Sequence, residues 1–219
     1  MQRPSLHAVA LLALISLARA PITWAQAPAP RPGPDAVWDP PAGAIERVHD
    51  ELERHNGAEE AAIVNAMQAF KAKPAAIAFA HRLGDDGGYL GSLKPSGPLL
   101  IGQLYFPLRA NENAEPYVID AANRLVRPAQ ECNVTRAELD RHPLYAKLAN
   151  KAELSLWPPQ SDPVESKLPE GGQELVYAFR LRPCHACADA ALVKLGYAFG
   201  ADGKYKGRRV VDVVPPPKE

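Results

Sequence analysis

The strongest structural signal in the sequence is an alternating run near the C-terminus, over residues 174–214. Apolar residues occupy every second position over 175–181 and again over 193–199, which is the period of a strand with one buried face. Asp202-Gly203 supplies a tight turn into a third extended run, and prolines end that run. We therefore predict three consecutive antiparallel strands, the first two joined by the corner Cys184-His185-Ala186-Cys187.

Helical and extended patterns precede this run, in an order typical of a mixed fold. A capping box, Thr135-Arg136-Ala137-Glu138, predicts the start of a helix that Pro143 interrupts. The predicted elements are helices over 43–56, 58–72 and 75–83, strands over 89–93, 99–108, 117–119 and 125–127, a helix over 135–150, a strand over 154–157 and an unpatterned surface loop over 160–172. This order predicts an α+β fold, an antiparallel β-sheet of meanders with helices packed on one face.

The first residues predict export. A positive residue, Arg3, precedes an apolar run over 6–17, and Thr23-Trp24-Ala25 resembles a cleavage site, so residues 1–25 match a secretory signal peptide. The apolar run is shorter than the roughly 20 residues that a membrane span needs. We expect a periplasmic or secreted protein without a membrane span, made by a bacterium.

Composition divides the mature chain into a leader, a domain and a tail. Residues 26–42 form a proline-rich leader, in which Trp38 is expected to dock on the domain. Residues 43–214 are expected to form a single α+β domain, and 215–219 form a tail. The domain can also be divided into two halves, 44–128 and 135–214, each with helices followed by a meander.

The balance of charge argues against nucleic acid as a partner. Lys and Arg together number 25, and so do Asp and Glu, which gives a net charge of zero. A neutral chain exerts no long-range attraction on a phosphate backbone. We expect a protein partner instead.

The chain has three cysteines, Cys132, Cys184 and Cys187. In an oxidising compartment cysteines are more often paired than free. A Cys184–Cys187 bridge closes a tiny loop, and chain entropy then contributes only about 2 kcal/mol to stability. A bridge from Cys132 to either partner closes a loop of about fifty residues, for roughly 4 kcal/mol. We favour Cys184–Cys187, because both residues lie at one corner.

The Cys184-His185-Ala186-Cys187 corner allows two chemical readings besides a structural disulfide. A thioredoxin-type pair needs a helix after the second cysteine to lower a thiol pKa, whereas the residues after Cys187 read as a strand. A copper or zinc site would use Cys184, His185 and Cys187, with Cys132 as a candidate fourth ligand for zinc. A c-type haem requires a histidine directly after the second cysteine, and Ala188 stands there.

Other residues offer no assembled catalytic motif, so no catalytic residue is predicted. The sequence contains no nucleophile elbow, phosphate loop or dinucleotide fingerprint. Asp85-Asp86 lacks the pattern of a calcium loop and is expected to be a solvated turn. The remaining histidines of the mature chain are scattered singly, at 49, 55, 81 and 142.

The order strand, cysteine, His-containing loop, cysteine, strand, turn, strand over residues 175–214 resembles the core of the Ivy-type periplasmic lysozyme inhibitors. The resemblance implies that His185 inserts into an enzyme cleft and that Cys184–Cys187 staples the loop, which is shorter here than in the family. We thus expect a non-catalytic binding protein. The most specific form of this expectation is an enzyme inhibitor. The alternatives are a thiol-redox or copper/zinc protein and an accessory subunit of a cell-envelope assembly that docks through its leader.

Overall fold

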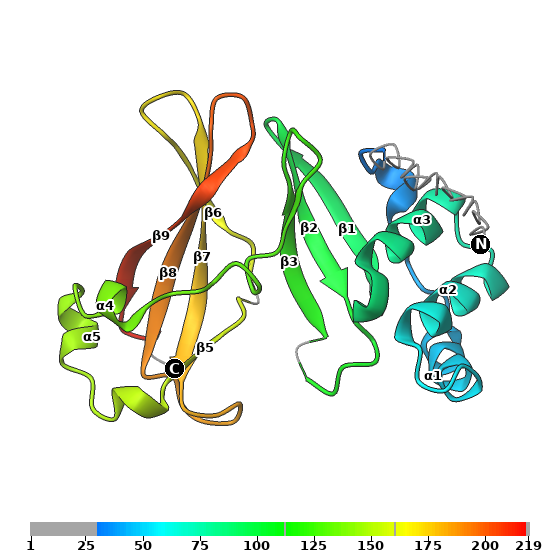
Figure 1. The fold of residues 1–219 in the computed structure, drawn as a ribbon, viewed down its shortest axis with the longest axis horizontal. Helices are drawn as coiled ribbons and strands as arrows, with labels where there is room; N and C mark the ends of the chain where they lie inside the picture. The colour runs from blue at the N-terminus through cyan, green and yellow to red at the C-terminus, as the bar shows by residue number, and fades with distance from the viewer. Residues whose placement is uncertain (1–29, 112, 160, 218–219) are drawn as a thin grey trace, which may run out of the picture.

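The computed structural model describes residues 30–111, 113–159 and 161–217. Three N-terminal helices lie beside two antiparallel sheets (Figure 1), so the α+β class is confirmed. The proposed signal peptide, residues 1–25, lies outside the described residues. Within the described part of the chain, no helix combines the length and the apolar character needed to cross a membrane.

The first three helices begin and end close to the predicted positions. The helices are α1 (Ala44–Arg54), α2 (Glu59–Ala69), α3 (Pro74–Leu83), α4 (Arg136–Leu139) and α5 (Pro143–Ala146), with 3-10 turns η1 (Pro34–Ala36), η2 (Gly84–Asp86) and η3 (Lys151–Glu153). The strands are β1 (Tyr89–Ser96), β2 (Leu99–Tyr105), β3 (Ala114–Ile119), β4 (Leu125–Val126), β5 (Ser155–Trp157), β6 (Val164–Lys167), β7 (Gln173–Arg182), β8 (Ala191–Phe199) and β9 (Tyr205–Val214).

The strands form two sheets rather than the one that the sequence predicts. Sheet A has the order β1-β2-β3-β4, and sheet B has the order β5-β7-β8-β9, with β6 also paired to β7. Every pairing is antiparallel. The predicted C-terminal run of three strands is therefore confirmed as β7, β8 and β9.

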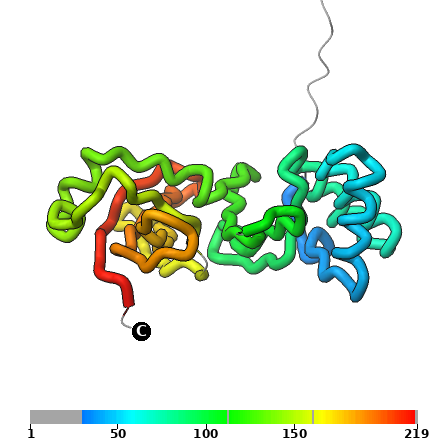
Figure 2. Tube along the Cα trace, turned by 90° about the horizontal axis from the view of Figure 1, so that it is seen from below, coloured from blue at the N-terminus to red at the C-terminus, as the bar shows by residue number. Residues whose placement is uncertain are grey.

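Sheet A is the middle layer of the molecule, because other layers cover both faces of its strands β2 and β3. On one face, Leu104 and Tyr117 pack against Phe79 of α3. On the other face, Ile101 and Val118 join the core of sheet B. Figure 2 shows the helices, sheet A and sheet B in a row. This position explains why neighbouring positions of β2 are apolar on both faces, since each face meets a different layer.

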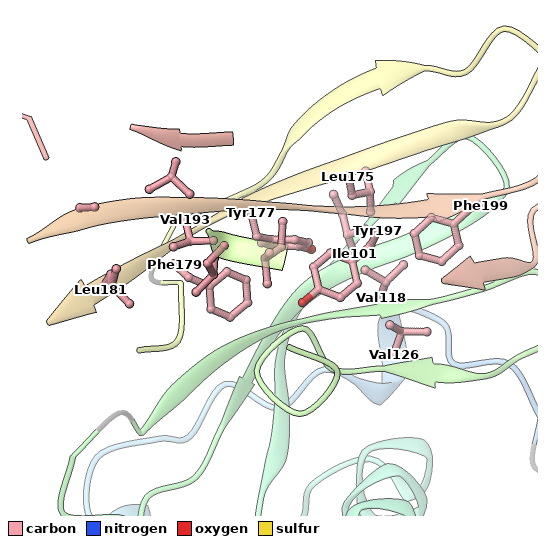
Figure 3. Close-up of a cluster of buried hydrophobic side chains, with 14 of the residues drawn as sticks. Ile101, Val118, Val126, Leu175, Tyr177, Phe179, Leu181, Val193, Tyr197 and Phe199 are labelled. Carbon is pink, nitrogen blue, oxygen red and sulfur yellow. The ribbon is translucent and has the colours of Figure 1, made fainter. Parts of the chain in front are cut away.

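The core between the two sheets is built from the alternating residues of β7 and β8 (Figure 3). Tyr177 and Phe179 of β7 point inward beside Val193 and Tyr197 of β8, and each is at most 1% exposed. Burying each such side chain contributes about 1.5–3 kcal/mol, so this face fixes the register of the sheet. The short helices α4 and α5 contact β9 at the far edge of sheet B.

The start of the domain is packed, and the expected docking of Trp38 is confirmed. Trp38 is 5% exposed, and its amide donates to the carbonyl oxygen of Leu90 at 2.8 Å. Its ring lies edge-on to Tyr89, with ring centroids 4.8 Å apart.

Two predictions for the middle of the chain are wrong. The expected unpatterned loop over 160–172 contains β6, an exposed edge strand paired with β7. The helix expected to reach residue 150 ends at Ala146, and Asn150 takes a left-handed conformation with φ of 51°. The sequence VESK of β6 has no apolar face, so only its pairing with β7 makes it a strand.

Candidate functional site

The connection between β7 and β8, residues 183–190, forms a disulfide-closed corner that we call the tip (Figure 1). Cys184 and Cys187 are bonded to each other, with Cα atoms 5.1 Å apart. The Cys187 amide donates to the Cys184 carbonyl oxygen at 3.2 Å, and the Ala190 amide donates to the Leu181 carbonyl oxygen at 2.8 Å. The predicted Cys184–Cys187 disulfide is confirmed, and hydrogen bonds support the tip where the strands resume pairing.

His185, the candidate binding residue, is exposed at the end of sheet B. Its ring lies edge-on to the indole of Trp157, with ring centroids 5.4 Å apart and planes inclined at 70°. The register of β5 places Trp157 opposite Arg180, and the Trp157 Nε1 donates to the carbonyl oxygen of Arg182 at 3.3 Å. The imidazole therefore rests against an aromatic ring that is itself anchored to a strand.

Two arginines on the face of β7 that points away from the core lie beside an aspartate of the tip. Arg180 donates through Nε to both carboxylate oxygens of Asp189, at 3.0 and 2.8 Å. The Nε of Arg182 lies 3.9 Å from the same carboxylate, which is too far for a hydrogen bond, and its guanidinium stands 4.8 Å from the centroid of the Trp157 ring. A pocket of about 570 Å³ opens between these side chains, the tip and Pro216-Pro217.

The tip differs from a thioredoxin-type pair in the element that follows its second cysteine. After Cys187 the chain passes through three residues and enters β8 at Ala191. The dipole of a helix, which lowers the pKa of the reactive thiol in thioredoxin-type pairs, is therefore missing from this position.

The described residues do not assemble the metal site that the sequence allows. Both sulfurs of the tip are consumed by the disulfide. Cys132, the candidate fourth ligand, is a free thiol packed against the sheet B core, where its Sγ donates to the carbonyl oxygen of Ala129 at 2.9 Å. Burial raises the pKa of the Cys132 thiol. Among the described residues, no three histidines, cysteines, aspartates or glutamates come together in a way that could hold a metal ion.

The scattered histidines and the Asp85-Asp86 turn lie on other elements, where some of these side chains contact acidic or basic neighbours. The Nδ1 of His81 is 2.7 Å from Glu60, and the Nε2 of His55 is 3.4 Å from Glu51. The Asp86 side chain is 40% exposed in its turn, in agreement with the prediction of a solvated turn, and it also pairs with Arg127 of the segment after β4. These contacts link helices and turns of the fold and leave the tip as the candidate site.

The residues around the tip that sequence reasoning missed are Trp157, Arg180, Arg182 and Asp189. Arg180 and Arg182 share the outward parity of β7, which was a usable signal for a common face. The pairing of β5 with β7, which brings Trp157 to the tip, carries no local sequence signal because β5 has only three residues.

No protein-family model, curated protein or solved structure matches this chain, so the likeness to the Ivy-type lysozyme inhibitors remains one of strand and loop order over residues 175–214.

Proposed function

We propose that this chain is an exported, non-catalytic binding protein that presents the tip to a protein partner in the periplasm or outside the cell. The observation that best supports the proposal is that His185 is exposed on a disulfide-closed tip, where its ring packs against Trp157. A loop restrained by a disulfide and by paired strands loses little conformational entropy when it binds, which favours affinity. The signal-peptide pattern over residues 1–25 supports export.

The sharpest form of this proposal is an inhibitor of a cell-wall-degrading or host enzyme whose cleft receives His185. It is supported by the exposure of the imidazole and by the order of strands and cysteines shared with the Ivy-type inhibitors. An imidazole can donate a hydrogen bond to a catalytic carboxylate, which is the group that glycoside hydrolases place in their clefts.

Turnover by a panel of lysozymes, measured with the chain that begins at Gln26, tests the inhibitor form. We expect inhibition of at least one enzyme, weakened at least tenfold, or about 1.4 kcal/mol, by His185→Ala. His49→Ala, which changes an exposed histidine on α1, is the matched control and should leave inhibition unchanged. Failure to inhibit any enzyme of the panel removes the inhibitor form, and equal inhibition by His185→Ala removes the role of the tip.

A thiol-redox or copper/zinc function at Cys184, His185 and Cys187 is the second candidate. The observation that favours it is the exposure of Cys184 at a Cys-x-x-Cys corner. Mass spectrometry after alkylation without reductant would then show a free pair of thiols, or metal bound in proportion to protein and lost in Cys187→Ser. A bridge that resists mild reduction and protein that carries no metal would exclude this candidate.

An accessory role in a cell-envelope assembly is the third candidate, based on the proline-rich leader. Trp38 is engaged in the protein's own domain, so the part of the leader free to contact a partner would have to be its prolines. Co-purification with and without residues 26–42 distinguishes this candidate from binding through the tip.

A further inference from the structure

Arg182 carries a buried charge that its neighbours compensate only in part. Its side chain is 6% exposed, and its Nε has no hydrogen-bond partner among the residues that the structure describes. The carboxylate of Asp189 is 3.9 Å away and is already held by two hydrogen bonds from Arg180. Leaving a buried charged donor without a hydrogen bond is unfavourable for folding. A protein that retains such a donor is therefore expected to gain a functional advantage from it.

The pocket beside Arg182 combines a positive end with an apolar wall. Among the lining residues that the structure describes, two guanidinium groups face one carboxylate, which leaves one positive charge in excess. The wall consists of small or apolar groups from the tip and the C-terminal segment, namely Ala186, Cys187, Ala188, Pro216 and Pro217. A volume of about 570 Å³ accommodates a group of amino-acid size.

We propose that this pocket binds the carboxylate of a polypeptide, either an acidic side chain or a chain terminus, through Arg182. A carboxylate presents two oxygens in the geometry of a guanidinium fork and forms strong, charge-assisted hydrogen bonds with it. Its single negative charge matches the single excess positive charge of the pocket. A phosphate group carries about −1.5 to −2 charges and would meet Asp189 with greater repulsion.

This proposal rests on the proposed function, because it takes the ligand to be part of the same protein partner. The pocket shares the tip as one wall, and Trp157 contacts both His185 and Arg182. A partner that receives His185 can thus place a neighbouring acidic group in the pocket. Two linked contacts of this kind bind more tightly than either alone, because the second forms at a high effective concentration.

NMR titration of the chain that begins at Gln26 with short blocked peptides tests the proposal without the partner. The probes are acetyl-Ala-Glu-Ala-amide, acetyl-Ala-Ala-Ala with a free carboxylate, acetyl-Ala-Gln-Ala-amide and inorganic phosphate. We expect saturable shifts of the Arg182 Nε–H resonance with one or both carboxylate peptides and none with the glutamine peptide. Which of the two peptides binds more tightly tells whether the pocket selects a side chain or a chain terminus.

Two arginine variants provide the comparison. Arg182→Gln should weaken binding of the carboxylate peptide at least tenfold. Arg209→Gln should leave it unchanged, although Arg209 lies on the same face of sheet B, where it donates two hydrogen bonds of 2.8 Å to Glu174. If Arg182→Gln does not fold, the Nε–H titration of the unmodified chain decides the question.

Three results would overturn the proposal. They are equal binding of the glutamate and glutamine peptides, no saturable shift of the Arg182 Nε–H at about 10 mM of either carboxylate peptide, and tighter binding of phosphate than of carboxylate. Peptide binding in a chain that inhibits no enzyme would leave the carboxylate pocket standing and remove only the inhibitor form of the proposed function.

Discussion

Asp120 is a buried carboxylate that joins the two sheets. It is 2% exposed, and its Oδ1 accepts hydrogen bonds from the amides of Ala122 at 2.8 Å and Arg124 at 2.9 Å. Its Oδ2 accepts a third hydrogen bond, from the amide of Tyr205 at the start of β9, at 3.0 Å. One side chain therefore shapes the β3–β4 turn of sheet A and fixes that turn to sheet B.

Replacing this carboxylate should destabilise the folded protein. Asp120→Ala is expected to lower the free energy of unfolding by about 3 kcal/mol, because three amides lose their acceptor at once. Asp120→Asn keeps one acceptor oxygen and should cost less. Asp202→Ala is the matched control, since Asp202 also accepts from a turn amide, that of Lys204 at 3.1 Å, but is exposed. Urea unfolding measures all three variants, and similar losses for Asp120→Ala and Asp202→Ala would contradict the joining role.

Arg127 shows why the partners of an ion pair cannot be predicted from the sequence. It is 7% exposed, bonds to Glu115 through Nε and to Asp86 through Nη1, and lies 5.0 Å from the centroid of the Phe106 ring. Burial disfavours the charged guanidinium, but the hydrogen bonds to the two carboxylates outweigh this effect and raise the pKa of Arg127. Asp86 is 41 positions away in sequence, so only the fold selects it as the partner.

At the scale of single elements, α4 is a helix too short to be stable alone. Its capping box is present as predicted, with the Thr135 side chain accepting from the Glu138 amide and the Glu138 side chain accepting from the Thr135 amide. Arg208 of β9 donates to Glu138 at 2.6 Å. These bonds lower the pKa of Glu138 from its ordinary value of 4.5 to about 2, the bond from Arg208 being the main cause.

The stabilising effect of Glu138 should therefore depend on pH. A carboxylate whose pKa is lower in the folded state contributes fully above its unfolded pKa, near 4.5, and loses its contribution as pH falls toward 2. Glu138→Gln keeps the capping geometry and removes the charge, and it should lower the free energy of unfolding by roughly 1 kcal/mol at pH 7. Urea unfolding of both chains should show this difference shrinking between pH 4.5 and 2.

The same change at an exposed position provides the control. Glu53→Gln alters a glutamate on the surface of α1 and should leave the free energy of unfolding close to that of the unmodified chain across this pH range. A Glu138→Gln difference that stays constant from pH 7 to pH 2 would show that the charge of Glu138 contributes nothing through Arg208.

Elements whose own residues show a helical or alternating pattern could be predicted from the sequence. Elements that depend on contacts with a neighbouring strand could not. The strand predicted over 89–93 is longer in the structure, where β1 continues to Ser96. Ser96 is 7% exposed because sheet B covers it, with its Oγ donating to Glu165 at 2.8 Å and accepting from Gln173 at 3.0 Å. Polar residues at the end of β1 thus remain paired through contacts far away in sequence.

At the scale of the whole molecule, the two sheets share one hydrophobic core. Ile101 of β2 is 2% exposed and belongs to the same cluster as Phe179 of β7 and Val193 of β8. Layers that share a core lose part of it when either unfolds, so we expect sheets A and B to unfold together. The two halves considered from the sequence, 44–128 and 135–214, would then not be independent folding units.

Hydrogen exchange tests this expectation in one sample. The slowest amides of β2 and β8 should report the same free energy of opening, and Ile101→Ala should lower both values by about 3 kcal/mol. If the variant lowers protection in β2 while β8 keeps its original value, the two sheets unfold separately and the shared core does not couple them.

The sequence by itself determined the helices α1 to α3, the β7–β8–β9 meander and the capping box of α4, because each depends on residues close together in the chain. It favoured the disulfide at the tip, and the structure decided that pairing over a bridge to Cys132. Only the tertiary structure decided that there are two sheets, that β2 and β3 are covered on both faces and that Trp157 and Arg182 meet at the tip. Those features depend on which faces and side chains lie opposite one another. The local pattern of apolar residues does not identify the element that lies opposite.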